Sequence, residues 1–201
     1  MSENVVWHPG TVSEEQRHEL TGGPGVTVWL TGLSGSGKST IARELEAALF
    51  KRGRLGYVLD GDNIRHGLNG DLGFSREDRT ENVRRVSEVA KLMCDAGLVA
   101  IVPVISPYRS GRAEARASHV ERGLRFLEVY VDTPLEICEE RDPKGLYKMA
   151  RAGEIEEFTG VSDPYEEPTD SDVHIETVNV SVQRGVELIL ESLDRFERQT
   201  S

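Results

Sequence analysis

A glycine-rich motif constrains this chain more than any other feature of its sequence. The segment Gly32–Ser39 reads GLSGSGKS and fits the pattern G-x-x-x-x-G-K-[ST] at every constrained position. An apolar run at 26–30 precedes this phosphate loop, and a helical pattern begins at Thr40. Glycines let the backbone turn its N–H groups inward, and the helix N-terminus adds positive partial charge. The motif predicts a nucleotide site in which Lys38 reaches the β- and γ-phosphates and the Ser39 hydroxyl binds Mg²⁺.

The overall charge limits the kinds of molecule that the protein is expected to bind. The chain has 201 residues, a net charge of −11 and a sequence pI of about 5.0. This balance argues against nucleic acid or an acidic membrane surface as a partner, because both need a basic face. A small anionic substrate is compatible with it, since a local basic pocket can form in an acidic protein. The sequence has no run of 18 apolar residues, so we expect no transmembrane helix.

The two cysteines indicate a reducing compartment. Cys94 and Cys138 fall in apolar helical patterns, and their spacing is not that of a disulfide framework or a metal site. We expect both to be buried free thiols. The first residues lack the basic and apolar segments of a secretory signal. The sequence therefore predicts a cytoplasmic protein. The five histidines show no metal-binding spacing, and we expect no metal role for them.

Apolar runs alternate with helical patterns along most of the chain. Strands are expected at residues 26–30, 55–60, 98–105, 126–132 and 174–177. Helices are expected at residues 40–51, 79–96, 110–122, for a short stretch from 134, and at 182–196. This alternation predicts an α/β three-layer sandwich, a mainly parallel sheet between two layers of helices. We expect residues 1–24 to be an N-terminal extension and residues 25–201 to be a single domain.

Polar residues that follow the strands mark the expected site. In parallel sheets, ligands bind outside the carboxyl ends of the strands. Besides the phosphate loop, three such segments are 60–63 (DGDN), 106–109 (SPYR) and 132–134 (DTP). Asp60 and Asp62 suit the orientation of waters on Mg²⁺ or the acceptance of a proton from an attacking hydroxyl. An ordinary Asp-Gly turn is the alternative for these residues.

The next segment is dense in arginine. Guanidinium forks suit phosphate and sulfate oxygens, so these residues are candidates for anion binding. Arg84 and Arg85 are expected instead to pair with glutamates on an exposed helix face. Arg65, Arg79 and Asn82 are the stronger candidates, because residues 79 and 82 share a face near the helix start.

Residues 141–161 have the composition of a lid. The segment begins with basic residues and is punctuated by Gly145, Gly153 and Gly160. This pattern fits a mobile lid that closes over phosphates and excludes water. A surface insertion is the alternative.

Together these motifs resemble one family, the adenylylsulfate kinases (APS kinases). The resemblance runs from about Trp7 to Thr177, and the phosphate loop is the part of it that many kinases share. The more specific blocks are DGDNIRHGLNGDLGFSREDRTENVRRVSEVAKLMCDAG at 60–97, ISPYR at 105–109, RDPKGLYKMAR at 141–151, FTG at 158–160 and DPYE at 163–166. Ser171 stands where a proline is more usual in the family, in a stretch with no obvious chemistry.

The resemblance implies a fold and an activity. The fold is that of the P-loop nucleoside triphosphate hydrolases, with one kinase domain at 25–201. The activity is transfer of the γ-phosphate of Mg-ATP to the 3′-hydroxyl of adenosine 5′-phosphosulfate, which gives 3′-phosphoadenosine 5′-phosphosulfate and ADP. This is the second step of sulfate activation. The resemblance also implies a homodimer and a functional link to an ATP sulfurylase.

The resemblance further assigns roles to matching positions. ATP is expected at Gly32, Leu33, Ser34, Gly35, Ser36, Gly37, Lys38, Ser39, Thr40 and Arg141. The acceptor is expected at Asp62, Arg65, Phe74, Arg79, Asn82, Ile105, Ser106, Lys144, Leu146 and Phe158. Asp62 and Lys38 are the expected catalytic residues, and Asp62 would orient or deprotonate the 3′-hydroxyl. Ser39 would bind Mg²⁺ directly and Asp60 through water. Phe74 and Phe158 would stack on the two faces of an adenine.

Ser106 occupies the position described in the family as a phosphoserine intermediate. In-line transfer between bound ATP and a bound alcohol needs no covalent relay, so hydrogen bonding at a strand end is the alternative role.

Two other functions are also compatible with the sequence. One is a kinase for another small alcohol, such as a sugar acid or a nucleoside. The other is a nucleotide-binding subunit without catalysis, which the intact Lys38, Ser39, Asp60 and Asp62 argue against.

Overall fold

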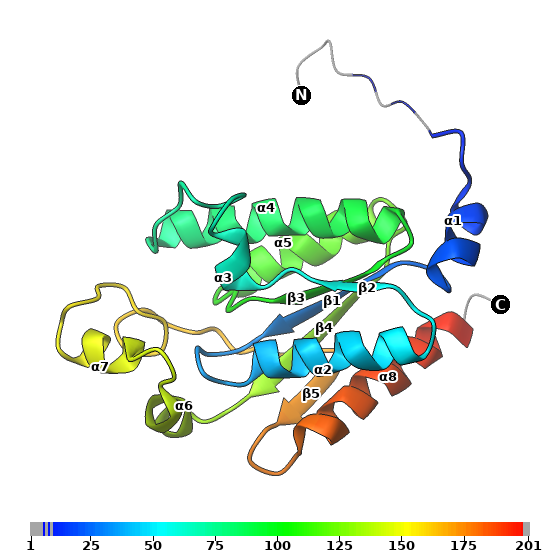
Figure 1. Cartoon of the computed structure of the whole chain (residues 1–201). Helices are drawn as coiled ribbons and strands as arrows, with labels where there is room; N and C mark the ends of the chain where they lie inside the picture. Colours follow the sequence, from blue (N-terminus) through cyan, green and yellow to red (C-terminus); the bar gives the residue numbers. More distant parts are fainter. Residues whose placement is uncertain (1–5, 7, 9, 199–201) are drawn as a thin grey trace.

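A parallel sheet of five strands lies at the centre of the molecule. The computed structural model describes residues 6, 8 and 10–198. Within them the strand order is β2-β3-β1-β4-β5, and every pair of neighbouring strands is parallel (Figure 1). The strands are β1 Val26–Thr31, β2 Gly56–Val58, β3 Val99–Pro103, β4 Phe126–Asp132 and β5 Val173–Glu176. The expected α/β architecture is confirmed.

Helices cover both faces of this sheet. One face carries α2 (Lys38–Lys51) and α8 (Val182–Arg198), and the other carries α4 (Arg76–Asp95) and α5 (Arg109–Val120) (Figure 1). The remaining described helices are α1 (Glu14–Thr21), α3 (Gly61–Ile64), α6 (Leu135–Arg141) and α7 (Leu146–Arg151). None of the helices within the described residues is long and apolar enough to span a lipid bilayer.

Side chains alternate along each strand, which divides the core into two clusters. On one side, Leu30 of β1 packs with Leu45 of α2 and Ile189 of α8. On the other, Trp29 packs with Val86 of α4. All five side chains are fully buried. Burying apolar surface at about 25 cal/mol per Å² is the main stabilising contribution to such a sandwich.

Several elements begin or end at residues other than those expected. β2 stops at Val58 instead of residue 60, because Asp60 already serves as the N-cap of α3 and its Oδ1 accepts a hydrogen bond from the Asp62 N–H at 3.0 Å. α4 begins at Arg76 instead of residue 79, because the Ser75 hydroxyl caps it by accepting from the Asp78 N–H at 3.1 Å. Short polar side chains at these caps therefore set the boundaries.

The N-terminal extension contains a helix that the apolar pattern does not predict. α1 begins with a capping box in which Ser13 and Gln16 exchange side-chain and backbone hydrogen bonds. It buries none of its residues. It is held by a hydrogen bond from the Leu55 N–H to the Thr21 carbonyl at 3.0 Å and by a 3.8 Å ion pair between Arg17 and Asp95. Local capping explains this helix better than burial does.

One backbone N–H on the outer edge of β2 is bound by a side chain. β2 pairs with β3 on one side only. On its other side, the Val58 N–H donates to Oε1 of Glu46, which projects from α2, at 3.1 Å. A carboxylate thus takes the place that a neighbouring strand would occupy on this N–H.

His119 is a buried histidine of the core. It lies at the end of α5, fully buried, with its ring edge-on to Phe126 at 5.0 Å. Its Nδ1 lies 2.7 Å from the Ala115 carbonyl and its Nε2 lies 2.9 Å from the Thr27 hydroxyl. Because a carbonyl can only accept, Nδ1 carries the proton and Nε2 accepts from Thr27. Burial lowers the pKa of His119, so the neutral ring is the stable form.

Substitution of Gly25 is expected to destabilise the fold strongly. A Cβ at this position would lie 1.9 Å from the Cys94 carbonyl oxygen at the end of α4. Since the clash is with backbone, Gly25→Ala should lower the free energy of unfolding by about 3 kcal/mol, measured by urea denaturation. Gly67→Ala is the matched control, because its Cβ meets nothing within 4 Å, and it should stay within about 1 kcal/mol of the parent. Equal urea midpoints for Gly25→Ala and Gly67→Ala would contradict the expected clash at Gly25.

Stability should fall as the pH drops below the ordinary pKa of histidine. The unfolded chain binds a proton at His119 near pH 6.5, whereas the folded pKa is lower. The unfolded state therefore binds more protons in this range, and folding loses up to about 1.4 kcal/mol per pH unit from this group as the pH falls. Unfolding free energies between pH 8 and 5 should show this slope in the parent and a shallower slope in His119→Gln. Equal slopes would exclude His119 as the source.

Candidate active site

One large cleft lies at the carboxyl edge of the sheet. It has a volume of about 1340 Å³ and is lined by residues that follow β1, β2, β3 and β5, together with the segment from α6 to Thr159. Most of the residues that the sequence singled out line it: Ser34, Gly35, Ser36, Gly37, Lys38, Ser39, Thr40, Asp60, Asp62, Arg65, Phe74, Arg79, Asn82, Ile105, Ser106, Arg141, Lys144, Leu146 and Phe158. Gly32 and Leu33 do not line it, and neither do Tyr108, Arg109 and residues 132–134 of the strand-end segments.

Gly32 instead fixes the approach of the phosphate loop to the sheet. Its φ is 150°, and a Cβ there would lie 2.5 Å from the Val131 carbonyl oxygen. The loop is also held from β4, because the Thr133 hydroxyl donates to the Ser36 carbonyl at 3.0 Å. Thr133 in turn contacts the Thr177 hydroxyl at 2.5 Å. The end of β4 thus holds the loop directly, and Thr177 after β5 contacts the side chain that does so.

Lys38 is the buried cation of the loop. Its Nζ donates to the carbonyls of Gly32 at 2.9 Å and Leu33 at 2.6 Å, and to the Ser36 hydroxyl at 3.4 Å. The side chain is only 7% exposed. Burial lowers the pKa of Lys38 to about 8, an effect that Asp60 and Asp62 oppose. An anion bound in the loop would favour the charged amine, so the site is organised for negative charge.

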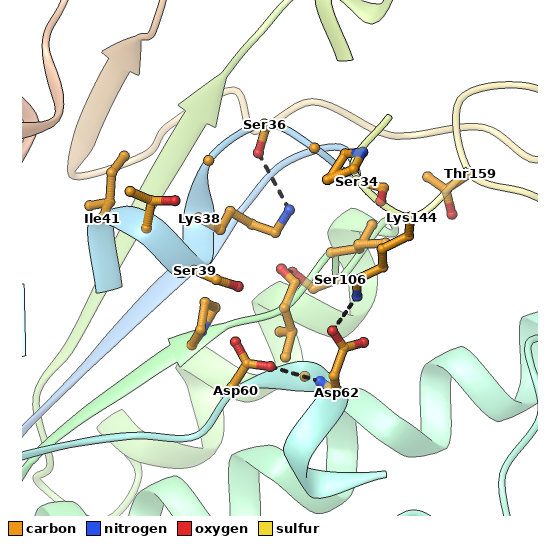
Figure 2. Close-up of a pocket in the computed structure, with 18 of the residues that line it drawn as sticks. Ser34, Ser36, Lys38, Ser39, Ile41, Asp60, Asp62, Ser106, Lys144 and Thr159 are labelled. Carbon is orange, nitrogen blue, oxygen red and sulfur yellow. Dashed lines mark hydrogen bonds and ion pairs between the residues drawn. The ribbon is translucent and has the colours of Figure 1, made fainter. Parts of the chain in front are cut away.

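Asp60 and Asp62 lie across the cleft from the phosphate loop. Figure 2 shows Lys38 and Ser39 on one side and the two carboxylates on the other. Asp62 forms an ion pair with Lys144, which reaches across from the segment after α6 (Figure 2). Both side chains are more than half exposed, so this pair is a weak one. A basic side chain and a carboxylate therefore meet at the centre of the cleft.

The anion-binding candidates cluster at one end of the cleft. The Arg65 guanidinium lies 4.3 Å from the centre of the Phe74 ring and donates to the carbonyls of Leu72 and Gly73. The Asn82 amide oxygen accepts from Asn69 Nδ2 at 2.9 Å. Phe74 is 58% exposed, so one aromatic face is open to a stacking partner.

Arg79 is more deeply buried than the sequence suggested. It is 8% exposed, and it donates to the Phe74 carbonyl at 2.8 Å, the Glu157 carbonyl at 2.6 Å and the Thr159 hydroxyl at 2.8 Å. These three hydrogen bonds occupy three of its five N–H groups. Arg79 thus ties the start of α4 to residues 157–159, and its two other N–H groups make no hydrogen bond among the described residues.

The segment at 141–161, which the sequence predicts to be a lid, takes part in a small hydrophobic cluster. Tyr147 and Phe158 pack edge-on at 4.9 Å, beside Cys138. The Tyr147 hydroxyl donates to the Ser34 carbonyl at 2.9 Å, and Arg141 donates to the Gly35 carbonyl at 3.3 Å. These contacts place the segment over the phosphate loop. Helix α7, which lies inside this segment, was not predicted from its sequence.

Ser106 is buried and held in an unusual backbone conformation. Its φ is 42°, in the left-handed region, and it is 3% exposed. Its Oγ accepts from Trp29 Nε1 at 3.0 Å and donates to Thr31 Oγ1 at 3.0 Å. Thr31 in turn donates to the Ile105 carbonyl at 2.7 Å and meets the Tyr165 hydroxyl at 2.9 Å. The hydroxyl of Ser106 is therefore engaged in a network between strand ends.

Two other expectations are confirmed among the described residues. Arg84 and Arg85 both donate to Glu81, at 2.6 Å and 2.8 Å, and these bonds lower the pKa of Glu81 to about 2. Cys94 and Cys138 are buried free thiols. Burial raises the pKa of both, so neither is poised as a nucleophile.

One wall of the cleft, formed by residues that follow β5, was not predicted from the sequence. Thr177, Val180, Ser181 and Val182 line it after β5. The rule that ligands bind at the carboxyl ends of strands applies to β5 as well, so its expected end at residue 177 was the available signal. Thr159 was also missed as a separate residue, although it lies within the FTG block.

Comparison with known proteins places this geometry in a family. The family model described as adenylylsulphate kinase matches residues 24–176. The adenylyl-sulfate kinase of Clostridium kluyveri is 53% identical over 192 residues, which are 96% of this chain and 95% of that protein. That of Klebsiella pneumoniae is 59% identical over 174 residues, 87% and 86% of the two chains.

Solved structures agree with this assignment. The APS kinase CysC of Mycobacterium tuberculosis, in complex with AMPPNP and APS, has 51% identity and a TM-score of 0.83, over 85% of this chain and 98% of that one. A gluconokinase of Sinorhizobium meliloti, at 20% identity and a TM-score of 0.57 over 88% and 95% of the two chains, shares the fold alone. With a phosphate loop, opposed carboxylates and these relatives, the chain belongs to the adenylylsulfate kinase family.

Proposed function

We propose that this chain transfers the γ-phosphate of ATP to the 3′-hydroxyl of adenosine 5′-phosphosulfate, giving 3′-phosphoadenosine 5′-phosphosulfate and ADP. The observation that carries the proposal is the single cleft that joins the phosphate loop to the cluster around Arg65 and Phe74. A kinase needs both substrates in one cavity, because transfer is direct and in line. The relative whose structure was solved in complex with AMPPNP and APS supports the choice of substrates.

The phosphate loop and Lys38 are proposed to hold the ATP phosphates. The loop N–H groups and the start of α2 favour negative charge. In the described structure the Lys38 amine is bound to carbonyls of its own loop, and phosphate oxygens would replace these acceptors. We assign Arg141 to the nucleotide base, because it lies beside Gly35 at the lid end of the loop.

Asp62 is proposed to orient the acceptor hydroxyl and to take its proton. It lies opposite the phosphate loop (Figure 2), where the 3′-oxygen must sit to attack the γ-phosphorus. As the new O–P bond forms, the bond to the β-phosphate oxygen breaks, ADP leaves and the hydroxyl proton passes to the Asp62 carboxylate. Lys144 would then exchange its contact with Asp62 for one with the substrates.

The acceptor is proposed to lie between Phe74 and Phe158. An adenine stacked on the open face of Phe74 would bring its phosphosulfate toward Arg65 and the two free donors of Arg79. Asn82, Ile105 and Leu146 complete this end of the cleft. The guanidinium groups offset the repulsion between two polyanionic substrates.

Mg²⁺ is proposed as the cofactor, with Ser39 as its direct ligand and Asp60 binding through water. Both offer hard oxygen donors, and they face each other across the cleft (Figure 2). Among the described residues no group of three His, Cys, Asp or Glu could hold a metal by itself, which accords with an ion held chiefly by nucleotide phosphates. When bound, Mg²⁺ supplies neutralisation of phosphate charge.

Ser106 is proposed to act through hydrogen bonds and not as a phosphoserine. Its hydroxyl already accepts from Trp29 and donates to Thr31, and it is almost fully buried. Direct transfer needs no intermediate on the protein.

The wider setting is also proposed. We divide the chain into an extension at 1–24 and a kinase domain at 25–201 with its lid at 141–161, and we place the protein in the cytoplasm, which the unpaired buried thiols support. A homodimer is proposed as its assembly; a hexameric APS kinase of Thiobacillus denitrificans shows that one relative does assemble, although this chain spans only 32% of that protein. An adenylyl-transferring enzyme, an ATP sulfurylase, must supply the acceptor.

The activity is tested by mixing the protein with Mg-ATP and adenosine 5′-phosphosulfate and following ADP release. Release is expected to depend on the acceptor and to stop when magnesium is chelated. Gluconate and adenosine serve as alternative acceptors. Turnover with gluconate or adenosine but not with adenosine 5′-phosphosulfate would reject the proposed function. Binding of ATP without turnover on any of the three acceptors would also reject it.

Replacement of Asp62 is expected to remove turnover. Asp62→Asn keeps the size of the side chain but cannot take the hydroxyl proton, so kcat should fall by about 100-fold or more, with little change in the KM for ATP. Asp71→Asn is the control, because Asp71 is an exposed carboxylate of the neighbouring segment that pairs with Arg85. Initial rates at saturating substrates measure the effect. Near parental kcat in Asp62→Asn would remove its assigned role.

A further inference from the structure

Two residues of the described chain hold a backbone conformation that usually requires glycine. Ser106 has φ 42° and Glu157 has φ 52°, and both lie beside the cleft. The carbonyl oxygen of each accepts a hydrogen bond from a buried arginine: Ser106 from Arg112 Nη1 at 2.7 Å, and Glu157 from Arg79 Nη2 at 2.6 Å. Such conformations persist only where the surroundings over-determine them. Arg112 and Arg79 are therefore candidates for the groups that hold Ser106 and Glu157 in this conformation.

Arg112 has no role in the chemistry described so far. It lies on α5, is 2% exposed and does not line the cleft. Besides the Ser106 carbonyl, it donates through Nε to Glu128 Oε1 at 2.8 Å and through Nη2 to the Glu166 carbonyl at 2.6 Å. One planar guanidinium thus joins β4, the loop after β3 and the segment that follows the lid.

The segment after the lid, residues 163–167, is tied to the same loop by further bonds. The Glu166 N–H donates to the Pro107 carbonyl at 2.8 Å, and the Tyr108 hydroxyl donates to Asp163 Oδ2 at 2.9 Å. The Tyr165 hydroxyl meets Thr31, which also bonds the Ile105 carbonyl. Arg112 joins the two sides of this contact region, because it donates to the Ser106 carbonyl on one side and to the Glu166 carbonyl on the other.

We infer that Arg112 is a positioning residue for the acceptor site, acting through the backbone of residues 105–107 and the base of the lid. It holds Ser106 in its left-handed conformation and so sets the wall that Ile105 and Ser106 form. Glu128 supplies the charge that keeps the guanidinium in place. The inference rests on the proposed function. ATP binds to a different wall, so its affinity should not depend on Arg112.

Steady-state kinetics of Arg112→Lys test this. Lysine retains the charge opposite Glu128, but its single ammonium group cannot span the two carbonyls as the planar fork does. The KM for adenosine 5′-phosphosulfate should rise at least about fivefold, as expected for loss of a charge-assisted hydrogen bond, while the KM for ATP stays within about twofold. An unchanged acceptor KM, or equal changes for both substrates, would overturn the inference.

Arg116→Lys is the matched control. Arg116 lies one turn further along α5 and pairs with the same Glu128, at 3.6 Å, and with Asp172, at 2.5 Å. It has no hydrogen bond to the carbonyls of Ser106 or Glu166 among those of the described structure. The Arg116→Lys variant should have the parental KM for adenosine 5′-phosphosulfate. A rise equal to that of Arg112→Lys would show that the Glu128 pair alone matters and would overturn the inference.

A glycine at position 106 separates positioning from a general structural effect. Glycine adopts a positive φ without strain, so Arg112→Lys should raise the acceptor KM by a smaller factor in a Ser106→Gly background than in the parent. The same factor in both backgrounds would contradict the role of Arg112 in holding this conformation. Comparing the two factors cancels whatever Ser106→Gly does alone.

Circular dichroism and thermal unfolding confirm that each variant is folded before its kinetics are compared. If Arg112→Lys does not fold, Arg112→Leu/Glu128→Leu takes its place, because it leaves no buried charge unpaired, and the same selective rise in acceptor KM is expected. Turnover by the parent enzyme distinguishes failure of the proposed function from failure of the inference. No turnover by the parent rejects the proposed function, whereas an active parent with an unaltered Arg112 variant rejects only the inference.

Discussion

The parallel direction of all five strands is the constraint on which the site depends. It brings every strand's carboxyl end to one edge of the sheet, so that the phosphate loop, Asp60 and Ser106 meet although they are distant in sequence. The loop can approach β4 closely because Gly32 has no side chain to collide with Val131. Thr133 then fixes its Ser36 carbonyl. The proposed positions of both substrates depend on this arrangement of the backbone.

The site concentrates positive charge in an acidic protein. The chain carries a net charge of −11, yet one cleft gathers two lysines and several arginines. Lys38 is desolvated and bound to carbonyls, and Arg65 and Arg79 are directed by carbonyl acceptors. The two guanidinium groups are oriented by the protein before a ligand arrives, whereas Lys38 would exchange its loop carbonyls for phosphate oxygens. The acidic exterior does not prevent this, because charge acts locally where water is excluded.

Features that depend on local chemistry could be predicted from the sequence, and those that depend on distant contacts could not. The phosphate loop, the faces of α2 and α4 and the pairing of Arg84 with Glu81 follow from spacing along the chain. The contacts of Arg79 with Glu157 and of Arg112 with Glu166 join residues far apart in sequence. No periodicity encodes such contacts. The sequence suggested Arg79 for an anion, but only the fold shows that three of its donors serve the protein.

The side chain of Glu46 has a consequence for how copies of this protein behave beside one another. An edge strand with free N–H groups is a template on which another strand can add. At β2 the Val58 N–H is already bound by a carboxylate, and a second chain would have to displace that charge and bury it. The edge therefore resists sheet extension at little expense to the fold. One glutamate on a helix that covers the sheet thus bears on whether the protein remains dispersed at high concentration.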